Sequence, residues 1–143
     1  MLSQTCKISI KAVIYLSGKS KKGEKAGIKE IAKRIDASEH TIGKTLQILV
    51  KRRIINSQKG PTGGFYLDEA QQQLPIYSIV EAIDGEGIFK KCGLGLNKCS
   101  DSHPCPIHQE YKIGRDILEN IFRNKKIQDL YDPVNEGIAF LMG

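Results

Sequence analysis

Three of the four cysteines in this chain fall in one short segment, CGLGLNKCSDSHPCPIH, at positions 92–108. Six residues separate Cys92 from Cys99, five separate Cys99 from Cys105, and His108 closes the segment. Thiolates and an imidazole select zinc or iron-sulfur clusters over calcium or magnesium. The spacing therefore indicates one shared inorganic partner. The candidate ligands are Cys92, Cys99, Cys105 and His108.

The composition of this segment predicts a loop rather than a helix or a strand. Gly93, Gly95, Pro104 and Pro106 are interspersed with small polar residues, and this mixture opposes regular backbone structure. A loop of this kind is free to wrap its side chains around a small group.

Four interpretations of the loop are open. Structural disulfides would leave one of three local cysteines unpaired, and nothing places the chain outside the cell. The two-residue gap between Cys105 and His108 suits structural zinc, but Cys92 and Cys99 are too far apart for a zinc knuckle. An iron-sulfur cluster tolerates irregular gaps, and glycines let backbone N–H groups approach its sulfides. A metal-free thiol switch is the fourth. We favour a cluster, [2Fe-2S] or [4Fe-4S], with zinc as the alternative.

The length and hydropathy of the chain limit its class. Its 143 residues suffice for one compact domain with a modest core and an appended element. No apolar run approaches the roughly 18 residues needed to cross a bilayer, and the first residues lack the apolar centre of a signal peptide. We therefore expect a cytoplasmic protein with reduced thiols and no membrane partner.

The net charge of +6 is distributed unevenly. Residues 1–66 hold 14 Lys or Arg against 4 Asp or Glu, whereas residues 67–143 hold 8 against 12. A strongly basic front half is typical of proteins that bind nucleic acid or an acidic membrane surface, and the acidic back half suits neither. The two halves are expected to have different partners.

The basic half carries the pattern of a helix-turn-helix. Apolar residues recur with helical spacing over 7–16 and again over 28–35. After a short break, Ser38 can cap a third helix that buries Ile42 and Leu46. Exposed hydroxyl, amide and cationic groups on the third helix are typical of a recognition helix. An ordinary helical hairpin is the alternative.

A β-hairpin is predicted directly after the third helix. Ile54 and Ile55 begin a short strand, the glycine-rich run 60–64 forces a turn, and 65–67 form the returning strand. A hairpin in this position is the wing of a winged helix. Its basic tip, with Lys59, could enter a minor groove or lie on phosphates. A purely structural turn is the alternative.

Two more helices are expected beyond the wing. Pro75 can open one that ends near Gly85, and the longest helical pattern runs from Gln109 to about Leu130. The apolar face of this long helix is wider than a small domain can cover. We therefore expect it to pack against the same helix of a second copy. The tail that follows is apolar enough to dock.

Together these elements predict a mainly α fold with a small β wing, as a winged helix-turn-helix plus a long C-terminal dimerisation helix. Residues 1–85 are the expected DNA-binding domain and residues 86–108 the cysteine-rich, cluster-binding loop. Residues 109–143 are expected to hold the dimerisation helix and the C-terminal tail.

Two motifs in this order resemble the Rrf-two (Rrf2) family of bacterial winged-helix transcription regulators, of the IscR, NsrR and RirA type. One is the wing KGPTGGFYL at 59–67, preceded by LQILVKRRII, and the other is the three-cysteine loop after EAIDG at 81–85. The resemblance covers nearly the whole chain. It implies a homodimer that binds a palindromic operator in double-stranded DNA. An iron-sulfur cluster in each subunit would set the affinity.

The resemblance also implies a ligand set. The three loop cysteines match the family's cluster ligands, although the first gap is one residue longer than in IscR-like members. His108 fits the fourth ligand of the IscR-like pattern. NsrR-like members take a residue from the first helix of the partner subunit, which makes Cys6 the alternative.

A winged helix would use its third helix to read base edges and its basic groups to neutralise phosphates. The candidate DNA-binding residues are Ser38, His40, Thr41, Lys44, Gln47, Lys51, Lys59, Thr62 and Gly63.

No arrangement of catalytic residues or phosphate-binding loop rises above chance in the sequence, so we expect no enzyme. Two functional alternatives to a cluster-controlled regulator stay open. One is a winged-helix regulator with structural zinc or a thiol switch. The other is a small iron-sulfur electron carrier that does not bind DNA.

Overall fold

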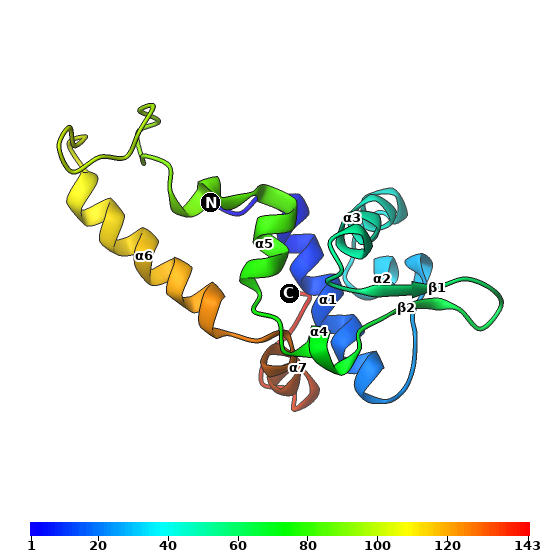
Figure 1. Ribbon diagram of the computed structural model, residues 1–143. Coiled ribbons are helices and arrows are strands. Elements are labelled where there is room, and N and C mark those ends of the chain that lie inside the picture. Colours follow the sequence, from blue (N-terminus) through cyan, green and yellow to red (C-terminus); the bar gives the residue numbers. More distant parts are fainter.

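The computed structural model describes residues 1–143 and has the predicted mainly helical architecture with one small sheet. A helical body lies in the middle, the hairpin projects at one end, and α6 with its preceding loop extends at the other (Figure 1). The elements in chain order are α1 Gln4–Lys21, α2 Ile28–Arg34, α3 Glu39–Lys51, β1 Asn56–Gln58, β2 Gly64–Tyr66, α4 Glu69–Gln72, α5 Tyr77–Asp84, the 3-10 helix η1 Glu86–Phe89, α6 His108–Asn124 and α7 Ile127–Asn135.

The predicted helix-turn-helix is confirmed in α2 and α3. Ser38 caps α3, because its Oγ accepts the backbone N–H of Thr41 at 3.1 Å. Ile42, Leu46 and Leu49 are completely buried and form the inward face of α3. The other faces of this helix are therefore left for solvent or a ligand.

The predicted wing is confirmed, but its first strand begins two residues later than expected. β1 and β2 are antiparallel, with Ser57 opposite Phe65. Ile54 and Ile55 precede β1 and are both buried in the main core, at 4% and 1% exposure. Side chains of consecutive strand residues point to opposite faces, so two neighbouring core residues do not belong to an exposed two-stranded ribbon. Ala26 adds a short bridge to Phe65.

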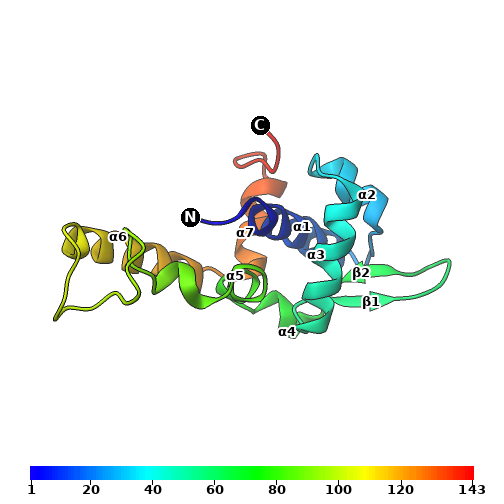
Figure 2. The same cartoon turned by 90° about the horizontal axis from the view of Figure 1, so that it is seen from above.

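The core is organised around α1, which is longer than the predicted helix over 7–16. Leu16 and Val13 are fully buried, as are the hydroxyl-bearing Ser9 and Ser17. The hydroxyl of Ser9 donates to the carbonyl of Thr5 at 2.7 Å, and that of Ser17 donates to a glutamine of α4. Since these polar side chains are satisfied internally, the helix continues through positions that interrupt its apolar pattern. Viewed from above, α1 lies between α7 and α3 (Figure 2).

The expected single helix from Gln109 to about Leu130 is wrong, because it is divided into α6 and α7. At Lys125 the backbone is extended, with φ −91° and ψ 120°. The carbonyl of Lys125 accepts the N–H of Ile76 at 2.9 Å, and the N–H of Ile127 donates to the carbonyl of Leu74 at 2.9 Å. These hydrogen bonds to the segment before α5 replace those that a continuous helix would make.

The C-terminal part of the chain returns to the N-terminal helix. Ile127 is fully buried, and the ring of Tyr131 on α7 packs against Gly18 of α1. The Nζ of Lys21 lies 3.1 Å from Asp132. It is therefore α7 that docks on the C-terminal half of α1. The prediction that the apolar tail beyond it docks is largely wrong, because Ile138 and Phe140 are 75% and 76% exposed and only Leu141 packs against the core.

The apolar residues of α6 lie on two faces instead of one. Leu118 and Phe122 pack inward against a small cluster that contains Phe89 and Tyr77. Ile113, Ile117 and Ile121 form an outer ridge and are 63%, 56% and 48% exposed. We call these three residues the isoleucine ridge.

No helix of the chain is both long and apolar enough to cross a membrane.

Candidate cluster-binding loop and DNA-binding face

The cysteine loop joins two fixed points. Its first end follows η1, where Phe89 stacks on Tyr77 of α5 with a ring separation of 5.6 Å. Arg115 of α6 reaches across and donates from Nη1 to the carbonyl of Lys91 at 2.9 Å. The second end is His108, the first residue of α6 and only 6% exposed. The loop therefore connects the α5 side of the molecule to the N-terminus of α6.

The four candidate ligands lie in two pairs. Cys99 Sγ is 3.4 Å from Nδ1 of His108. Cys92 and Cys105 are both largely buried, and their neighbouring thiols influence each other's pKa. All cysteines of the chain are free thiols. The loop has thus brought together residues 9 and 13 positions apart in sequence without any disulfide.

The backbone of the loop supplies N–H groups to the cysteines. The N–H of Leu94 lies 3.4 Å from Cys92 Sγ. This N–H and that of Leu96 hold the pKa of Cys92 below its usual value, because they stabilise the thiolate. Burial has the opposite effect on Cys105 and raises its pKa. Backbone donors aimed at sulfur are a feature that tunes thiolate-bound metal centres.

The donor set fits a thiolate-bound metal centre in chemistry, but the two pairs have not merged into one site. No group of three or more His, Cys, Asp or Glu side chains is positioned to hold a metal ion. Glycines at 93 and 95 leave the loop backbone adaptable, and Gly95 already has φ +77°. Gathering the four ligands around one group would therefore require the loop to close further.

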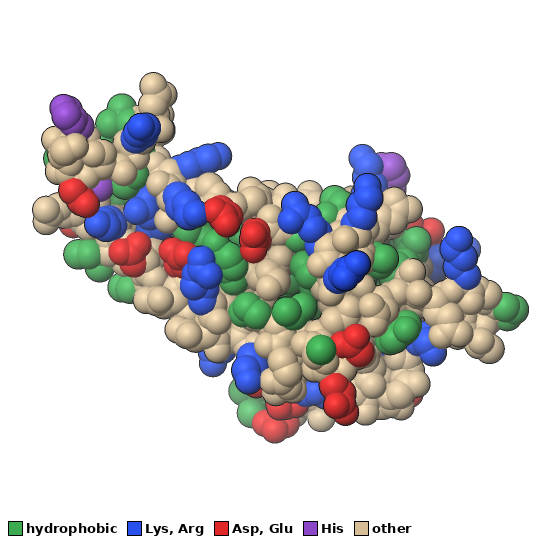
Figure 3. All heavy atoms as spheres, in the orientation of Figure 1, with side chains coloured by type: hydrophobic (Ala, Val, Ile, Leu, Met, Phe, Trp, Pro, Cys, Tyr) green, Lys and Arg blue, Asp and Glu red, His purple; other side chains and the backbone are tan.

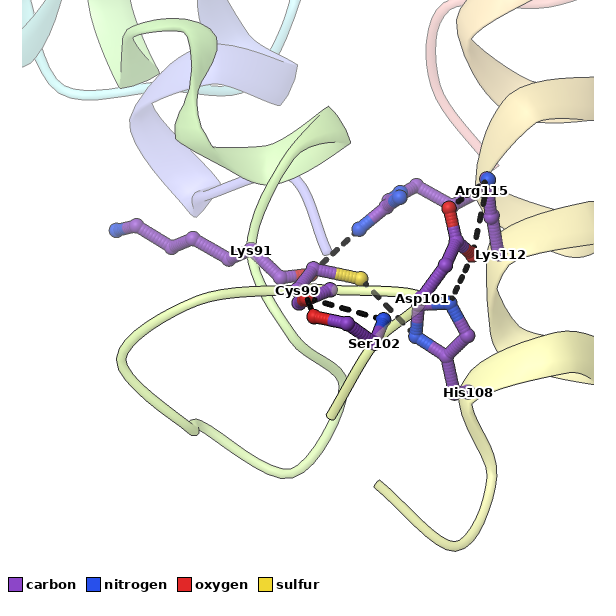
Figure 4. Close-up of polar contacts among 8 residues, drawn as sticks. Lys91, Cys99, Asp101, Ser102, His108, Lys112 and Arg115 are labelled. Atoms are coloured by element: carbon purple, nitrogen blue, oxygen red, sulfur yellow. Dashed lines mark hydrogen bonds and ion pairs between the residues drawn. The ribbon is translucent and has the colours of Figure 1, made fainter. Parts of the chain in front are cut away.

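His108 is held on both edges of its ring. Its Nε2 lies 2.8 Å from Oδ1 of Asp101, opposite the contact between Nδ1 and Cys99 (Figure 4). The Nζ of Lys112, one turn further along α6, lies 3.4 Å from each carboxylate oxygen of Asp101. The hydrogen bond to His108, followed by that to Lys112, lowers the pKa of Asp101. Sequence reasoning missed Asp101 and Lys112, because only the folded loop brings them to His108.

Cys6, the alternative fourth ligand, is enclosed by its own subunit. It is 0% exposed and packs with Tyr77, Val80 and Phe89. Burial, with a smaller effect of Asp84, raises the pKa of Cys6 to about 12. This thiol is therefore neutral at ordinary pH and faces away from solvent, where a partner's loop would have to approach.

The candidate DNA-binding residues on α3 fall into two groups. His40, Lys44, Gln47 and Lys51 are exposed. Ser38 and Thr41 bind to each other at the start of the helix, where the Ser38 hydroxyl donates to the Thr41 hydroxyl at 2.8 Å. The first group is thus free to contact a ligand. The second is used for capping, although the Ser38 side chain stays at the surface.

The wing contributes a basic tip. Lys59 and Thr62 are exposed, whereas Gly63 is half-buried in the turn. A Cβ on Gly63 would lie 2.0 Å from the carbonyl oxygen of Gln58, so only glycine fits this turn. The Gly63 N–H donates to the carbonyl of Gly60 at 3.0 Å. Gly63 therefore shapes the tip, and Lys59 supplies its charge.

A groove runs between α3 and the wing. Lys44, Lys51 and Lys59 line it together with Ser57 and Gln58, two polar residues that sequence reasoning missed. Both residues belong to β1. They could not be assigned to the groove from the sequence, because the sequence does not show which side of the hairpin faces α3. Lys and Arg side chains gather over α3, whereas acidic side chains are frequent around α4 and α7 (Figure 3).

Comparison with known proteins identifies the family. The model of the Rrf2 family, described as iron-dependent transcriptional regulator, matches residues 2–133. The chain belongs to the Rrf2 family. Its Rrf2 membership makes it a DNA-binding transcriptional regulator and not an enzyme.

Curated relatives carry matching names. A candidate HTH-type transcriptional regulator of Aquifex aeolicus is 28% identical over 132 residues, which are 91% of this chain and 90% of that protein. The HTH-type transcriptional regulator NsrR of Oceanobacillus iheyensis is 24% identical over 132 residues, or 92% and 89% of the two chains. Both alignments run through the winged helix and the cysteine loop of this Rrf2 chain.

Solved structures share the Rrf2 fold at low identity. CymR (YrzC), the global cysteine regulator of B. subtilis, has a TM-score of 0.75 with 17% identity and covers 92% of this chain and 96% of its own. IscR of T. potens has a TM-score of 0.74 with 14% identity, covering 97% and 91%. These likenesses establish the winged-helix architecture of the Rrf2 chain.

Proposed function

We propose that this Rrf2 regulator acts in the cytoplasm as a homodimer on a palindromic operator, and that an iron-sulfur cluster controls its affinity for DNA. Residues 1–85 would bind DNA, residues 86–108 would hold the cluster, and residues 109–143 would supply the dimer helix and the C-terminal tail. Cys92, Cys99, Cys105 and His108 would be the ligands. Membership of the Rrf2 family supports the proposal, because this family includes the iron-sulfur regulators IscR and NsrR, and proteins with these names are similar to this chain.

The observation that carries the proposal is the pairing within the loop. Three free thiols and one buried imidazole lie in two close pairs, and a backbone N–H already lies 3.4 Å from the sulfur of Cys92. Cys92 and Cys105 are buried but belong to neither apolar cluster of the fold, and Leu94 and Leu96 beside them are exposed, which disfavours a purely hydrophobic role for these cysteines. A cluster held by these thiolates would tie the loop together and would supply a redox-active centre at this place.

His108 is the better fourth ligand than Cys6 of the partner subunit. The ring nitrogen of His108 lies 3.4 Å from Cys99, whereas Cys6 is completely buried beneath α5 of its own subunit. Exposing Cys6 would require Tyr77 and Phe89 to separate. Gly93 and Gly95 would give the loop the backbone freedom that the longer gap between Cys92 and Cys99 requires.

A twofold dimer would present two recognition helices and two wings. Its contact would be the isoleucine ridge of α6, because three large apolar side chains in a row are otherwise left in water. The recognition helices would then address half-sites about one helical turn apart. His40, Lys44 and Gln47 would reach base edges, while Lys51 and Lys59 would neutralise phosphates.

The loop can influence DNA binding through α5. Its first end follows η1, whose Phe89 stacks on Tyr77 of α5, and α5 packs against both α1 and α3. Its second end begins α6, the proposed dimer helix. An ordered loop would therefore fix the angle between each winged helix and the dimer axis. A coupling free energy of about 1–3 kcal/mol is typical and would change operator occupancy roughly 5- to 150-fold.

The experiment that tests this proposal is anaerobic purification followed by absorption spectroscopy and analysis of iron and sulfide. We expect a coloured protein that loses its iron when Cys92, Cys99 or Cys105 is replaced by Ser. The matched control is Cys6→Ser, which should keep the cluster. A mobility-shift assay with genomic fragments should then show a cluster-dependent difference in DNA binding.

Other outcomes of the same experiment would favour the alternatives. Colourless protein with stoichiometric zinc would favour a structural metal site. Metal-free protein whose DNA binding responds to thiol oxidants would favour a thiol switch. A coloured protein that binds no DNA in any redox state would favour an electron carrier.

A further inference from the structure

We infer that Asp101 is the residue that positions His108 and leaves Nδ1, rather than Nε2, as the nitrogen available to the cluster. This inference rests on the proposed function, since it concerns the same loop. It adds a residue outside the four ligands and an atom within one of them.

The contacts of the imidazole ring decide which nitrogen is free. Nε2 lies 2.8 Å from Oδ1 of Asp101, and a carboxylate can only accept a hydrogen bond, so Nε2 carries the proton. A neutral imidazole then has its lone pair on Nδ1, which lies 3.4 Å from Cys99 Sγ. In the metal-free state the Cys99 thiol can donate to this lone pair. Once the thiol of Cys99 has lost its proton, its sulfur and Nδ1 of His108 would be two neighbouring metal-binding atoms.

The surroundings of the two residues explain why Asp101 can control the ring. The His108 side chain is 5% exposed, so water has little access to either edge, whereas Asp101 is 78% exposed. An exposed carboxylate would ordinarily sample several positions. Lys112 restricts it, because its Nζ lies 3.4 Å from both oxygens of Asp101. Since Lys112 is four residues after His108 on α6, one helical face carries both the ligand and the anchor of its partner.

The contacts of Asp101 join the cysteine loop to α6. Asp101 belongs to the middle of the loop, whereas His108 and Lys112 belong to α6. The Asp101 contact therefore fastens the loop to α6 before any ligand is bound. A carboxylate that accepts from the other nitrogen of a ligating histidine fixes the ring orientation and increases the basicity of the ligand.

The test uses a background in which His40→Gln and His103→Gln leave His108 as the single histidine. In metal-free protein, long-range ¹⁵N–¹H NMR should show the Nε2–H tautomer, and Asp101→Ala should convert it to a mixture. Asp101→Asn keeps an acceptor oxygen and should retain the tautomer. Asp116→Asn, which removes the same charge from the middle of α6, is the control and should change nothing.

The second readout uses reduced, cluster-loaded protein grown with histidine labelled with ¹⁵N at Nδ1 only. Hyperfine spectroscopy should find the label strongly coupled to the cluster spin in the unmodified loop and in Asp101→Asn. In Asp101→Ala we expect loss of that coupling in part of the molecules and release of iron to a chelator 10- to 100-fold faster. Neither nitrogen coupling nor tautomer would respond if Asp101 served only to stabilise the loop.

The failures of the two proposals are distinguishable. A coloured protein whose Nδ1 label is uncoupled, or whose Asp101→Ala variant keeps the original tautomer and iron-release rate, would overturn the role of Asp101 alone. A protein that takes up neither iron nor sulfide would overturn the proposed function, and the ligand assignment of Nδ1 with it.

Discussion

The ring of Tyr131 lies directly on Gly18, so that a Cβ added at position 18 would lie 2.1 Å from the ring. This contact joins α7, near the C-terminus, to α1, near the N-terminus. Both residues are held in place, since Gly18 is buried inside a long helix and Lys21 lies 5.2 Å from the centre of the Tyr131 ring.

Gly18→Ala is expected to destabilise the fold because the added methyl group overlaps the Tyr131 ring. Overpacking typically costs about 1–3 kcal/mol, against a gain of about 1 kcal/mol from the better helix propensity of alanine. Urea denaturation should show a lower free energy of unfolding. In a Tyr131→Ala background the overlap is gone, and the same Gly18→Ala change should be neutral or stabilising. Equal destabilisation in both backgrounds would contradict the role of the contact.

Ile117→Glu is expected to disrupt the proposed dimer. Ile117 is the middle residue of the isoleucine ridge, and a carboxylate there would be desolvated against its own copy in a twofold contact. Sedimentation should report a monomer with unchanged circular dichroism. The control is Ile138→Glu in the tail, where the isoleucine is 75% exposed, and the dimer should persist. A monomeric parent protein would show that the ridge has another purpose.

Lys59→Ala is expected to weaken DNA binding without changing sequence preference. Lys59 is exposed at the wing tip and lines the groove beside α3, where it would neutralise a phosphate. The slope of log affinity against log salt should fall by about one unit per removed contact. Lys125→Ala, between α6 and α7, is the matched control. A loss confined to one base position would instead assign Lys59 to base reading.

The stability of the fold should fall in alkaline solution because of Cys6. Its pKa is raised from 9.0 to about 12 by burial, so the unfolded chain loses this proton at lower pH than the folded one. The stabilising effect is complete below pH 9 and is lost as the pH rises toward 12. Between pH 8 and pH 10.5, the free energy of unfolding should fall more steeply with pH for the parent protein than for Cys6→Ala.

The difference between the two slopes should approach about 1.4 kcal/mol for each pH unit above 9, the value for one proton. Lysines and tyrosines titrate in both proteins, so their effects cancel in the comparison. Parallel curves would mean that the Cys6 thiol ionises in the folded state as it does in the unfolded chain.

The winged helix could be predicted because its signals are local. Ser38 before the apolar positions Ile42 and Leu46 defines the start and inner face of α3, and the glycine run of the wing specifies a turn. Family membership followed from two such motifs in the right order. Each signal depends on residues close together in sequence, so it survives without knowledge of the tertiary contacts.

The division of the last helix could not be predicted from such signals. The residues around Lys125 and Lys126 contain neither glycine nor proline, and the break comes from backbone hydrogen bonds to Leu74 and Ile76. The same limit applies to the two apolar faces of α6, because the sequence gives the spacing of its isoleucines but not the direction of the body.

The cysteine loop lies between these cases. Clustering of its thiols is visible in the sequence, and the ligand set stays a prediction. That His108 contacts Cys99 on one side and Asp101 on the other could not be foreseen, because an irregular loop has no repeat from which to infer side-chain directions. Only the fold shows that Lys112 of α6 completes the contact.

The extended pair at Lys125 and Lys126 gives α6 a pivot at one end. Hydrogen bonds on both sides of Pro75 clamp that base to the body, while 17 residues of helix, about 25 Å long, separate it from His108. A tilt of only about 10° about the base would carry the far end through about 4 Å, by the geometry of a rigid rod of that length. A rearrangement of the loop that displaces the His108 end of α6 by a few ångströms would therefore change the angle of the helix by only about 10°. The hydrogen bonds at Lys125 and Ile127 determine the point about which the helix rotates.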